Sequence, residues 1–483
     1  MVSFILPGNS ATGGFDVDNS LRFNDGSSDH LLIAPSSAGN KQTWTWSAWV
    51  KRGVLGTRQV LFSGYDQAAG LGESIEFTSG DKLEYDLDIA GTDFTVTSSM
   101  VFRDVSAWYH ILFIKDVTES TETNRIKVYV NGVQIALVEN ANGYPAENAT
   151  NGLINAAGDY EHHVGCLNPS SSFFDGYMCE VVFIDGTAQT NTDFGEFDED
   201  SGIWKPIDVS GLTFGTNGFY LEFKESGTSQ NSSGLGADTS GQDNHFAVNN
   251  LTAIDQSTDT CTNNFATLNP LDGNLGDSLF TEGNLKFDTN TGSNKPWSRS
   301  TIGVSSGKWY FEAKLITAAN NQAIGISDRP SPDFNSTELG AGAFDYSYQS
   351  ANSGDKYNNG SQSSYGNTYG ANDIVSCALD LDNLKVYFGK NGTFQNSGDP
   401  TSGATGTGAA FTITAPSLTN HGFYFFCLAD LTGANKSVWE ANFGSPSYSI
   451  SSGNSDGNGY GNFEYAVPSG YYAINTKNLA EYG

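Results

Sequence analysis

The sequence predicts an all-β protein of two antiparallel β-sandwich (jelly-roll) domains in tandem. The first reason is a strand-and-turn sequence pattern that occurs twice: Lys127–Val130 is followed by Asn131-Gly132, and Lys385–Phe388 is followed after two residues by Asn391-Gly392. Alternating β-forming residues before Asn-Gly are a strong hairpin signal, because both turn residues need a positive φ. The second reason is composition, since 56 glycines in 483 residues, with short apolar runs between polar turns, are typical of many strands. Two hairpins this far apart indicate two domains.

The expected strands fall into two series, each element being a short or alternating apolar run between Gly, Asn, Asp and Ser. The first series is Leu21–Phe23, Leu31–Ile33, Thr43–Val50, Val60–Phe62, Ile75–Phe77, Leu83–Ile89, Phe94–Val96, Trp108–Ile114, Ile126–Val130 and Tyr177–Ile184. The second is Leu285–Phe287, Lys308–Leu315, Ala323–Ile326, Ile374–Leu381, Lys385–Phe388, Gly422–Leu428 and Val438–Phe443. We expect no helix of ordinary length. The predicted organisation is an N-terminal arm (1–16), a first sandwich (17–205), a connector packed on it (206–264) and a second sandwich (265–483).

The charge of the chain limits its partners. It has 23 Lys and Arg against 54 Asp and Glu, a net charge of −31. Such a field repels phosphate backbones and anionic lipid headgroups, so we expect no nucleic-acid partner and no membrane insertion. No run reaches transmembrane length, and no signal peptide is recognisable. The five cysteines, an odd number without a CxxC pair, indicate assembly in a reducing cytoplasm.

One strand carries the best candidates for catalytic carboxylates. Glu84, Asp86 and Asp88 alternate with apolar residues and therefore share one strand face. A retaining glycosidase needs two carboxylates about 5–5.5 Å apart, one as nucleophile and one as acid. The solvent-facing side of a half-buried strand explains these acids more simply, so we expect no catalytic residue and no enzymatic activity.

The histidines give no metal-site signal. His162 and His163 are adjacent on an expected strand, so they face opposite sides and cannot chelate together. The other histidines, among them His30 and His421, show no ligand spacing. We therefore expect structural or surface histidines.

Tyrosines in polar loops are the candidates for ligand recognition: Tyr346, Tyr348, Tyr365, Tyr369 and Tyr460. A tyrosine offers a rigid amphipathic contact, and neighbouring Asn and Ser supply adaptable hydrogen bonds. The alternative is that some of them pack inside the second sandwich. Trp44 and Trp46 share one face of their strand, where core packing is favoured over a sugar-stacking platform.

Several segments resemble a known family. Ser20–Asn24, Trp46–Arg52, Ser106–His110 and Phe174–Tyr177 resemble a laminin-G-like, concanavalin A-like lectin domain. The continuation is similar to the version found in bacteriophage structural proteins, marine phages especially; it comprises Trp204–Pro206, Asn217–Leu221 and the junction Asn263–Pro270. The second half resembles a phage-type SPRY domain, on the segments Gly303–Glu312, Ile324–Ile326, Ala378–Asn383, Ala441–Gly444 and Pro468–Tyr471.

This resemblance implies a virion structural protein displayed on the phage exterior, assembled in the host cytoplasm and present in many copies or as a homo-oligomer. We expect a tail fibre or adhesin subunit that recognises a glycan or protein of the host surface and holds other virion proteins through its N-terminal arm. The alternative is a capsid decoration or fibre-adaptor protein that binds mainly other virion proteins. A glycan-cleaving enzyme is the third hypothesis. Laminin-G-like domains sometimes hold Ca²⁺, for which Asp25 and Asp29 are the candidates, and no other cofactor is expected.

Overall fold

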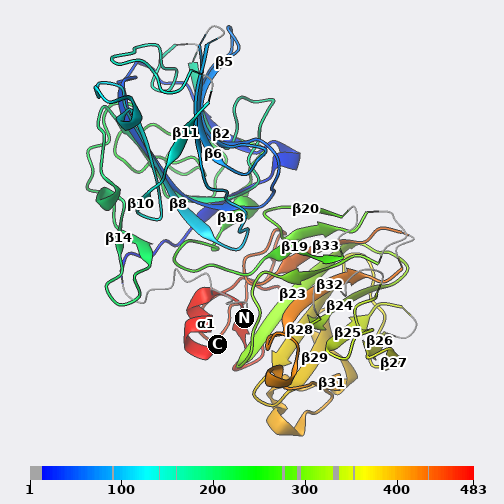
Figure 1. Cartoon of the computed structure of the whole chain (residues 1–483). Helices are drawn as coiled ribbons and strands as arrows, with labels where there is room; N and C mark the ends of the chain where they lie inside the picture. Colours follow the sequence, from blue (N-terminus) through cyan, green and yellow to red (C-terminus); the bar gives the residue numbers. More distant parts are fainter. Residues whose placement is uncertain are drawn as a thin grey trace. The chain divides into compact units, whose positions relative to one another are not determined.

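Two β-sandwiches make up the computed structural model, one ending at Asn264 and the other beginning at Phe265 (Figure 1). The structure describes residues 14–89, 92–140, 142–158, 160–274, 278–290, 295–329, 337–351, 354–432 and 435–483. The all-β fold class is confirmed. Most of the expected N-terminal arm, residues 1–13, lies outside the described residues.

The first domain has two antiparallel sheets. One has the order β10-β9-β8-β3-β13-β1-β18, with β16 also paired to β13. Its strands are β1 (Ser20–Phe23), β3 (Thr43–Arg52), β8 (Trp108–Asp116), β9 (Ile126–Val130), β10 (Val133–Gln134), β13 (Gly176–Asp185), β16 (Phe219–Leu221) and β18 (Gln256–Ser257).

The facing sheet has the order β11-β7-β6-β5-β4-β12-β2-β17. Its strands are β2 (His30–Ile33), β4 (Gln59–Asp66), β5 (Leu71–Phe77), β6 (Leu83–Ile89), β7 (Thr92–Ser98), β11 (Leu137–Glu139), β12 (Tyr160–Val164) and β17 (Ala247–Asn249). A separate hairpin joins β14 (Gly195–Phe197) to β15 (Trp204–Pro206).

Strand alternation determines the core of this domain. Trp44 and Trp46 of β3 are fully buried between the sheets, and Trp46 stacks on Phe62 at 6.3 Å between ring centroids. Trp49, one residue out of phase, packs in a separate cluster on the other face of the sheet. The core-packing interpretation of Trp44 and Trp46 is therefore confirmed.

Residues 206–264 add strands to both sheets of the first domain. β16 pairs with β13 and β18 with β1 in one sheet, while β17 pairs with β2 in the other. An ion pair of 2.7 Å between Lys51 of β3 and Asp259, both almost fully buried, also holds this segment in place. The segment is thus an integral part of the first sandwich.

The second domain also has two sheets. One has the order β19-β22-β32-β24-β25-β26-β27. Its strands are β19 (Leu268–Asn274), β22 (Trp297–Ser300), β24 (Gln322–Ser327), β25 (Asp345–Gln349), β26 (Asp355–Asn358), β27 (Ser361–Ser364) and β32 (Phe425–Asp430).

The other sheet has the order β20-β21-β33-β23-β28-β29-β30, with β31 on β29 and β34 parallel to β23. Its strands are β20 (Leu279–Thr281), β21 (Lys286–Asp288), β23 (Lys308–Thr317), β28 (Ile374–Asp380), β29 (Lys385–Lys390), β30 (Thr393–Phe394), β31 (Phe411–Thr412), β33 (Val438–Asn442) and β34 (Tyr472–Ala473).

Among the residues that the structure describes, helical structure occurs only in short pieces. The α-helix α1 (Thr476–Tyr482) begins at Asn475, whose side chain accepts a hydrogen bond from the Asn478 amide. The described 3-10 turns are Asp25–Ser27, Glu122–Asn124, Asn191–Asp193, Ala253–Asp255, Gln395–Ser397, Pro400–Thr405 and Pro416–Leu418. Within the described part of the chain, no helix has the length and apolar character needed to span a bilayer.

Both predicted Asn-Gly hairpins are confirmed. Asn131 and Gly132 have φ values of 47° and 77° and connect β9 to β10; Asn391 and Gly392 have 46° and 77° and connect β29 to β30. Each Asn side-chain oxygen accepts from a backbone amide of the strand beside the hairpin, His110 of β8 at 2.8 Å in the first domain and Ile374 of β28 at 2.9 Å in the second. The same turn, with the same side-chain bond, therefore closes a hairpin in each domain.

Candidate functional site

A shallow pocket lies between the sheets of the first domain. Strands β2 and β12 of one sheet and β13 and β16 of the other contribute to its wall, and its empty volume is about 280 Å³ including the open mouth. The apolar side is formed by Ile33, Pro35, Phe183 and Phe219. The polar side is formed by Asn155, His162, Asn217 and Asn244. Apolar walls with a few convergent polar groups are typical of small-molecule sites.

His162 of β12 faces this pocket in one defined protonation state. Its ring is 3% exposed, and burial lowers the pKa of His162 to about 4, so the imidazole is neutral at ordinary pH. Nε2 accepts a hydrogen bond of 2.7 Å from the Asn155 backbone amide, which places the remaining proton on Nδ1. Among the described residues, Nδ1 has no hydrogen-bond partner. A residue lining the pocket therefore carries one buried N–H donor without a partner in the described part of the chain.

Asp185, at the end of β13, fixes the loops that carry the pocket amides. Its carboxylate accepts from the Asn40 amide at 2.8 Å, the Asn155 side chain at 2.5 Å and the Asn217 amide at 3.2 Å. The Asn217 side chain donates in turn to Asn155 Oδ1 at 2.8 Å. Loops held by this many bonds keep the polar side of the pocket in place without a ligand.

The two partly exposed amides of the pocket keep an acceptor for a ligand. Asn217 donates its side-chain N–H groups to Ser37 O and Asn155, and Asn244 donates to the backbone oxygens of Thr216 and Gly218. Within the described ranges, no group donates to Oδ1 of either residue. The pocket thus combines one donor with two acceptors.

Four of the five tyrosines proposed for recognition are core residues, so the expectation that they form a binding surface is wrong. Tyr346, Tyr348, Tyr365 and Tyr369 are 4%, 0%, 7% and 5% exposed and belong to the main apolar cluster of the second domain. Their hydroxyl groups bond inward; that of Tyr369, for instance, lies 3.0 Å from Gln322 O and 2.9 Å from Tyr348 O. The alternative interpretation, packing inside the second sandwich, is the one the structure supports.

Tyr460 alone of the five stays partly exposed. It lies in the loop before the end of the chain, with Lys477 Nζ 5.8 Å from its ring centroid. Asp456 organises this loop by accepting from the amides of Asn458 at 2.9 Å, Tyr460 at 3.0 Å and Ala473 at 2.9 Å. A ligand-contacting role of Tyr460 stays a prediction.

The calcium candidates lie in the loop before β2. The Asp29 carboxylate is buried and accepts from the Asn24 amide at 3.0 Å and the Ser27 hydroxyl at 2.8 Å. Asp25 is half-buried, and this burial raises the pKa of its carboxyl group. Asp29 therefore has a clear structural role, and calcium binding at the loop stays a prediction.

The alternating acids of β6 lie on the partly exposed face of their sheet, as expected for a half-buried strand. Leu83, Tyr85 and Leu87 are buried, whereas Glu84, Asp86 and Asp88 are partly exposed. Glu84 accepts from the Thr97 hydroxyl at 2.6 Å and Asp86 from the Thr95 hydroxyl at 3.1 Å. Burial raises the pKa of both carboxyl groups, and Arg58 lies 3.5 Å from Asp86.

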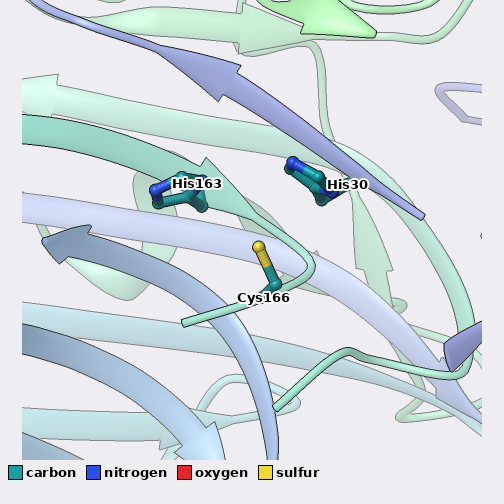
Figure 2. A group of neighbouring side chains, drawn as sticks. All are labelled: His30, His163 and Cys166. Atoms are coloured by element: carbon teal, nitrogen blue, oxygen red, sulfur yellow. The ribbon is translucent and has the colours of Figure 1, made fainter. Parts of the chain in front are cut away.

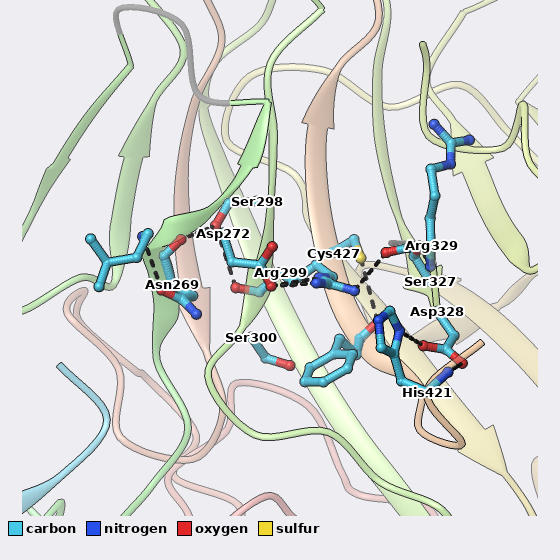
Figure 3. Close-up of polar contacts among 12 residues, drawn as sticks. Asn269, Asp272, Ser298, Arg299, Ser300, Ser327, Asp328, Arg329, His421 and Cys427 are labelled. Carbon is cyan, nitrogen blue, oxygen red and sulfur yellow. Dashed lines mark hydrogen bonds and ion pairs between the residues drawn. The ribbon is translucent and has the colours of Figure 1, made fainter. Parts of the chain in front are cut away.

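A polar network crosses one sheet of the second domain at β22, β24 and β32 (Figure 3). Arg299 donates to the Asp272 carboxylate and, at 2.9 Å, to the backbone oxygen of Arg329. His421 Nδ1 lies 2.6 Å from Asp328, whose other oxygen accepts from the His421 amide at 2.8 Å. Each group bonds to another member of the network, so the network fixes loops at this sheet end.

Three metal-ligating side chains meet in the first domain, contrary to the sequence-based expectation of isolated histidines. His30, His163 and Cys166 are buried, and one ligand atom of each lies within 4.8 Å of those of the others (Figure 2). Adjacent strands bring His30 and His163 together although they are far apart in the chain. The argument that His162 and His163 point to opposite sides holds, because His162 lines the pocket and His163 does not.

Neither the pocket nor the group of His30, His163 and Cys166 in the first domain was predicted from the sequence. Asn155, Asn217 and Asn244 come from three loops, and Asn is common in the polar loops of this chain, so its presence does not mark a site. The Gly218 that follows Asn217 was the one local signal of a tight turn near the pocket.

Comparison with known proteins identifies a different family in each half of the chain. Residues 25–191 match the family model described as the concanavalin A-like lectin/glucanases superfamily, and residues 308–425 match the SPRY domain model. The chain is 33% identical over 130 residues to heterogeneous nuclear ribonucleoprotein U-like protein 2 of Mus musculus, covering 24% of this chain and 15% of that protein. It is 34% identical over 107 residues to ATP-dependent RNA helicase Ddx1 of Drosophila melanogaster, covering 22% and 14%. The chain thus spans only a small part of the length of these relatives.

Solved structures are similar at low identity. The SPRY domain of human HERC1 is 20% identical, with a TM-score of 0.28, covering 36% of this chain and 96% of that one. A SAP-like pentraxin from Limulus polyphemus is 16% identical, with a TM-score of 0.28, covering 37% and 81%. A putative carbohydrate binding protein from Bacteroides ovatus is 14% identical, with a TM-score of 0.31, covering 49% and 59%.

Proposed function

We propose that this chain, a concanavalin A-like domain followed by a SPRY domain, is a binding protein of the bacteriophage virion exterior, a tail fibre or adhesin subunit that recognises a host-surface glycan. The observation that carries the proposal is the pocket between the sheets of the first domain. Its wall is apolar on one side and carries amides and an imidazole N–H on the other.

The chemistry of the pocket suits a hydroxyl group at the edge of a sugar residue. A sugar hydroxyl both donates and accepts, which matches the His162 Nδ1–H donor and the side-chain oxygens of Asn217 and Asn244. Phe183 and Phe219 also line the pocket but are almost fully buried, so they offer only a small apolar contact to the C–H groups beside such a hydroxyl. The enclosed part of the pocket has room for about one water molecule, so we infer that it takes a hydroxyl substituent of one sugar unit while the rest of the glycan stays at the open mouth.

The charge of the chain narrows the glycan class. A net charge of −31 disfavours anionic polymers such as phosphate-bearing or uronic-acid-rich polysaccharides. The proposed ligand is therefore a neutral hexose-containing glycan, bound weakly at each copy. Multicopy display would strengthen attachment, because later contacts become intramolecular.

A glycan array probed with the full chain, as single copies and clustered on a bead, tests this proposal. Binding to neutral glycans is expected to fall by about tenfold in Asn217→Ala, the equivalent of about 1.4 kcal/mol. Asn191→Ala is the matched control, since Asn191 likewise donates its side-chain N–H to a backbone oxygen, that of Gly132 at 2.8 Å, away from the pocket. An array without signal for the clustered protein, or equal binding by Asn217→Ala and the parent, would contradict the proposal.

We infer that binding is not accompanied by cleavage. The carboxylates of Glu84 and Asp86 accept hydrogen bonds from threonine hydroxyls, and Arg58 lies beside Asp86. This arrangement suits the partly exposed face of a surface strand. Purified chain incubated with the glycan found on the array is expected to release no reducing ends. If the chain releases reducing ends and Glu84→Gln abolishes their release, the hypothesis of a glycan-cleaving enzyme replaces the proposal of binding without cleavage.

A capsid decoration or fibre-adaptor role is the second candidate, and exposed apolar side chains of the second domain favour it. Leu271, Leu279 and Leu418 are 59%, 60% and 72% exposed, which suits contact with another virion protein. Gold-labelled antibodies against the chain, viewed on intact particles, distinguish the two: label at tail tips supports the adhesin, and label over the capsid supports decoration.

A further inference from the structure

The starting point is the group formed by His30, His163 and Cys166 in the first domain, called the His-Cys cluster below. Figure 2 shows the Cys166 sulfur facing the space between the two imidazole rings. The ring centroids are 5.9 Å apart, and the three side chains are 5%, 0% and 0% exposed by residue. None of these residues belongs to the pocket described above.

The backbone brings the cluster together in a defined way. β2 and β12 pair antiparallel with Leu31 opposite Val164, so His30 at the start of β2 lies beside the turn that follows β12. That turn contains Gly165 with φ +91°, where a Cβ atom would lie 2.7 Å from a ring carbon of Phe23. Glycine is thus needed for the bend that places Cys166 next to the two rings.

His30 has the protonation pattern of a metal ligand. Its Nδ1 lies 2.9 Å from the backbone oxygen of Ser28, which can only accept, so Nδ1 carries the proton. Nε2 therefore keeps its lone pair. A metal-binding imidazole commonly donates its other N–H to a backbone oxygen in this way, which fixes the orientation of the ring.

His163 is a buried imidazole whose polar atoms are not satisfied. Neither ring nitrogen forms a hydrogen bond with any described residue, although the ring is fully buried. Glu161 Oε2 lies 3.5 Å from Nε2, which is longer than a good hydrogen bond. A buried polar group without a partner is costly, and a bound ion at the cluster would remove that cost.

We propose that the His-Cys cluster binds a zinc ion through the two imidazoles and the Cys166 thiolate. Ligand distances of about 2.0–2.3 Å in a tetrahedral zinc site separate the ligand atoms by roughly 3.3–3.8 Å. The atoms of the cluster lie within 4.8 Å of one another, so small side-chain rotations bring them to that spacing. Nitrogen and sulfur ligands select zinc-like ions over Ca²⁺ and Mg²⁺, which need oxygen ligands.

Binding also balances the charges of the site. The Cys166 thiol releases its proton to solvent as the sulfur bonds to the ion, and the Glu161 carboxylate supplies further negative charge nearby. Water takes the fourth position. The ion would join the start of β2 to the turn after β12, so its role is structural and separate from the glycan proposal.

The test is made on the full chain refolded with Zn²⁺, with Co²⁺ as a spectroscopic substitute. We expect one zinc ion per chain after desalting, a thiolate-to-cobalt absorption band, and a higher melting temperature with zinc than with EDTA. Loss of a group that hydrogen-bonds to a metal ligand lowers metal affinity by about 10–100-fold. Cys166→Ala and His163→Gln remove ligands themselves and are expected to lose at least as much affinity. Ca²⁺ or Mg²⁺ should not change the melting temperature through this site.

Two control variants remove the same residue types elsewhere. Cys427 lies in the second domain, and His245 lies in the first domain outside the cluster. The variants Cys427→Ala and His245→Gln should both retain zinc and the cobalt band. The proposal is overturned if the parent chain holds no stoichiometric zinc, or if Cys166→Ala binds zinc as tightly as the parent. The parent measurement decides the question even if a cluster variant fails to fold.

Discussion

Lys115 and Glu73 form an ion pair of 2.6 Å that joins the two sheets of the first domain, from β8 on one side to β5 on the other. Their side chains are 2% and 0% exposed. The Glu73 carboxylate also accepts from the Tyr85 hydroxyl at 2.8 Å and from the amides of Leu153 and Ile154 at 2.6 and 2.8 Å. The buried Glu73 carboxylate thus has both an ion-pair partner and hydrogen-bond donors, as a charged group inside a protein requires.

Removing the cation should strongly destabilise the first domain. Lys115→Met leaves the Glu73 charge buried without its partner, which is expected to cost about 3 kcal/mol in the free energy of unfolding. Lys127→Met is the matched control, because Lys127 pairs with Glu119 at 3.8 Å on the surface and should cost less than about 0.5 kcal/mol. Chemical denaturation measures both, and equal effects would contradict the prediction. Adding Glu73→Gln to Lys115→Met should recover part of the loss.

Stability should fall between pH 5 and pH 8 through two buried glutamates. Burial raises the pKa of Glu180 and of Glu312 to about 7, from an ordinary value of 4.5. Because the folded-state pKa is raised, the stabilisation is complete below pH 4.5 and is lost as the pH rises through about 7.

Glu180→Gln should therefore flatten this profile by about 2 kcal/mol between pH 5 and pH 8. Glu196→Gln, at a side chain 59% exposed, is the control and should leave the slope unchanged. Burial lowers the pKa values of His110 and His162, so these two histidines titrate in the opposite sense; both are present in all three proteins, and the comparison between variants cancels their effect. Melting curves across this pH range give the result, and parallel profiles for Glu180→Gln and the parent would count against it.

The buried tyrosines should affect stability and not binding. Tyr369→Phe removes a hydroxyl group that lies within 3.0 Å of two backbone oxygens and should cost about 1–1.5 kcal/mol. Tyr460→Phe, in a partly exposed loop position, should change stability by less than about 0.5 kcal/mol. Thermal unfolding together with the glycan array tests both effects. A loss of binding by Tyr369→Phe at unchanged stability would restore the surface role that its burial argues against.

The hairpin glycines should tolerate no side chain. Gly132 has φ +77°, and a Cβ atom there would lie 2.2 Å from a ring carbon of Trp204. Gly56 has the same φ with nothing within 4 Å, so Gly56→Ala measures the backbone cost alone, about 1–2 kcal/mol. Gly132→Ala should cost at least about 1 kcal/mol more, because it adds the clash. Similar melting temperatures for the two variants would show that Trp204 moves aside freely.

The hairpins and the tryptophan core were predictable because their signals are local. Asn131-Gly132 and Asn391-Gly392 specify a turn through backbone conformation alone. Trp44 and Trp46 follow from strand alternation, which puts them on one face of β3.

The tyrosine assignment failed for a non-local reason. Asp345–Gln349 alternates polar and aromatic residues and looks half-exposed, yet all five residues are buried. Its polar face is covered from elsewhere in the chain, since Asp345 bonds to Arg329 and Ser347 to the backbone oxygen of Leu339. Similarly, the His-Cys cluster depends on the pairing of β2 with β12, which no spacing along the chain reveals.

The strands supplied by residues 206–264 decide how the first domain can be produced as a recombinant fragment. A gene fragment that stops at residue 205 lacks β16, β17 and β18 and leaves β1 and β2 as bare sheet edges. Bare edges pair with other molecules, so such a fragment would collect in inclusion bodies. A fragment extended to Asn264 keeps both edges covered and is the one suited to crystallisation.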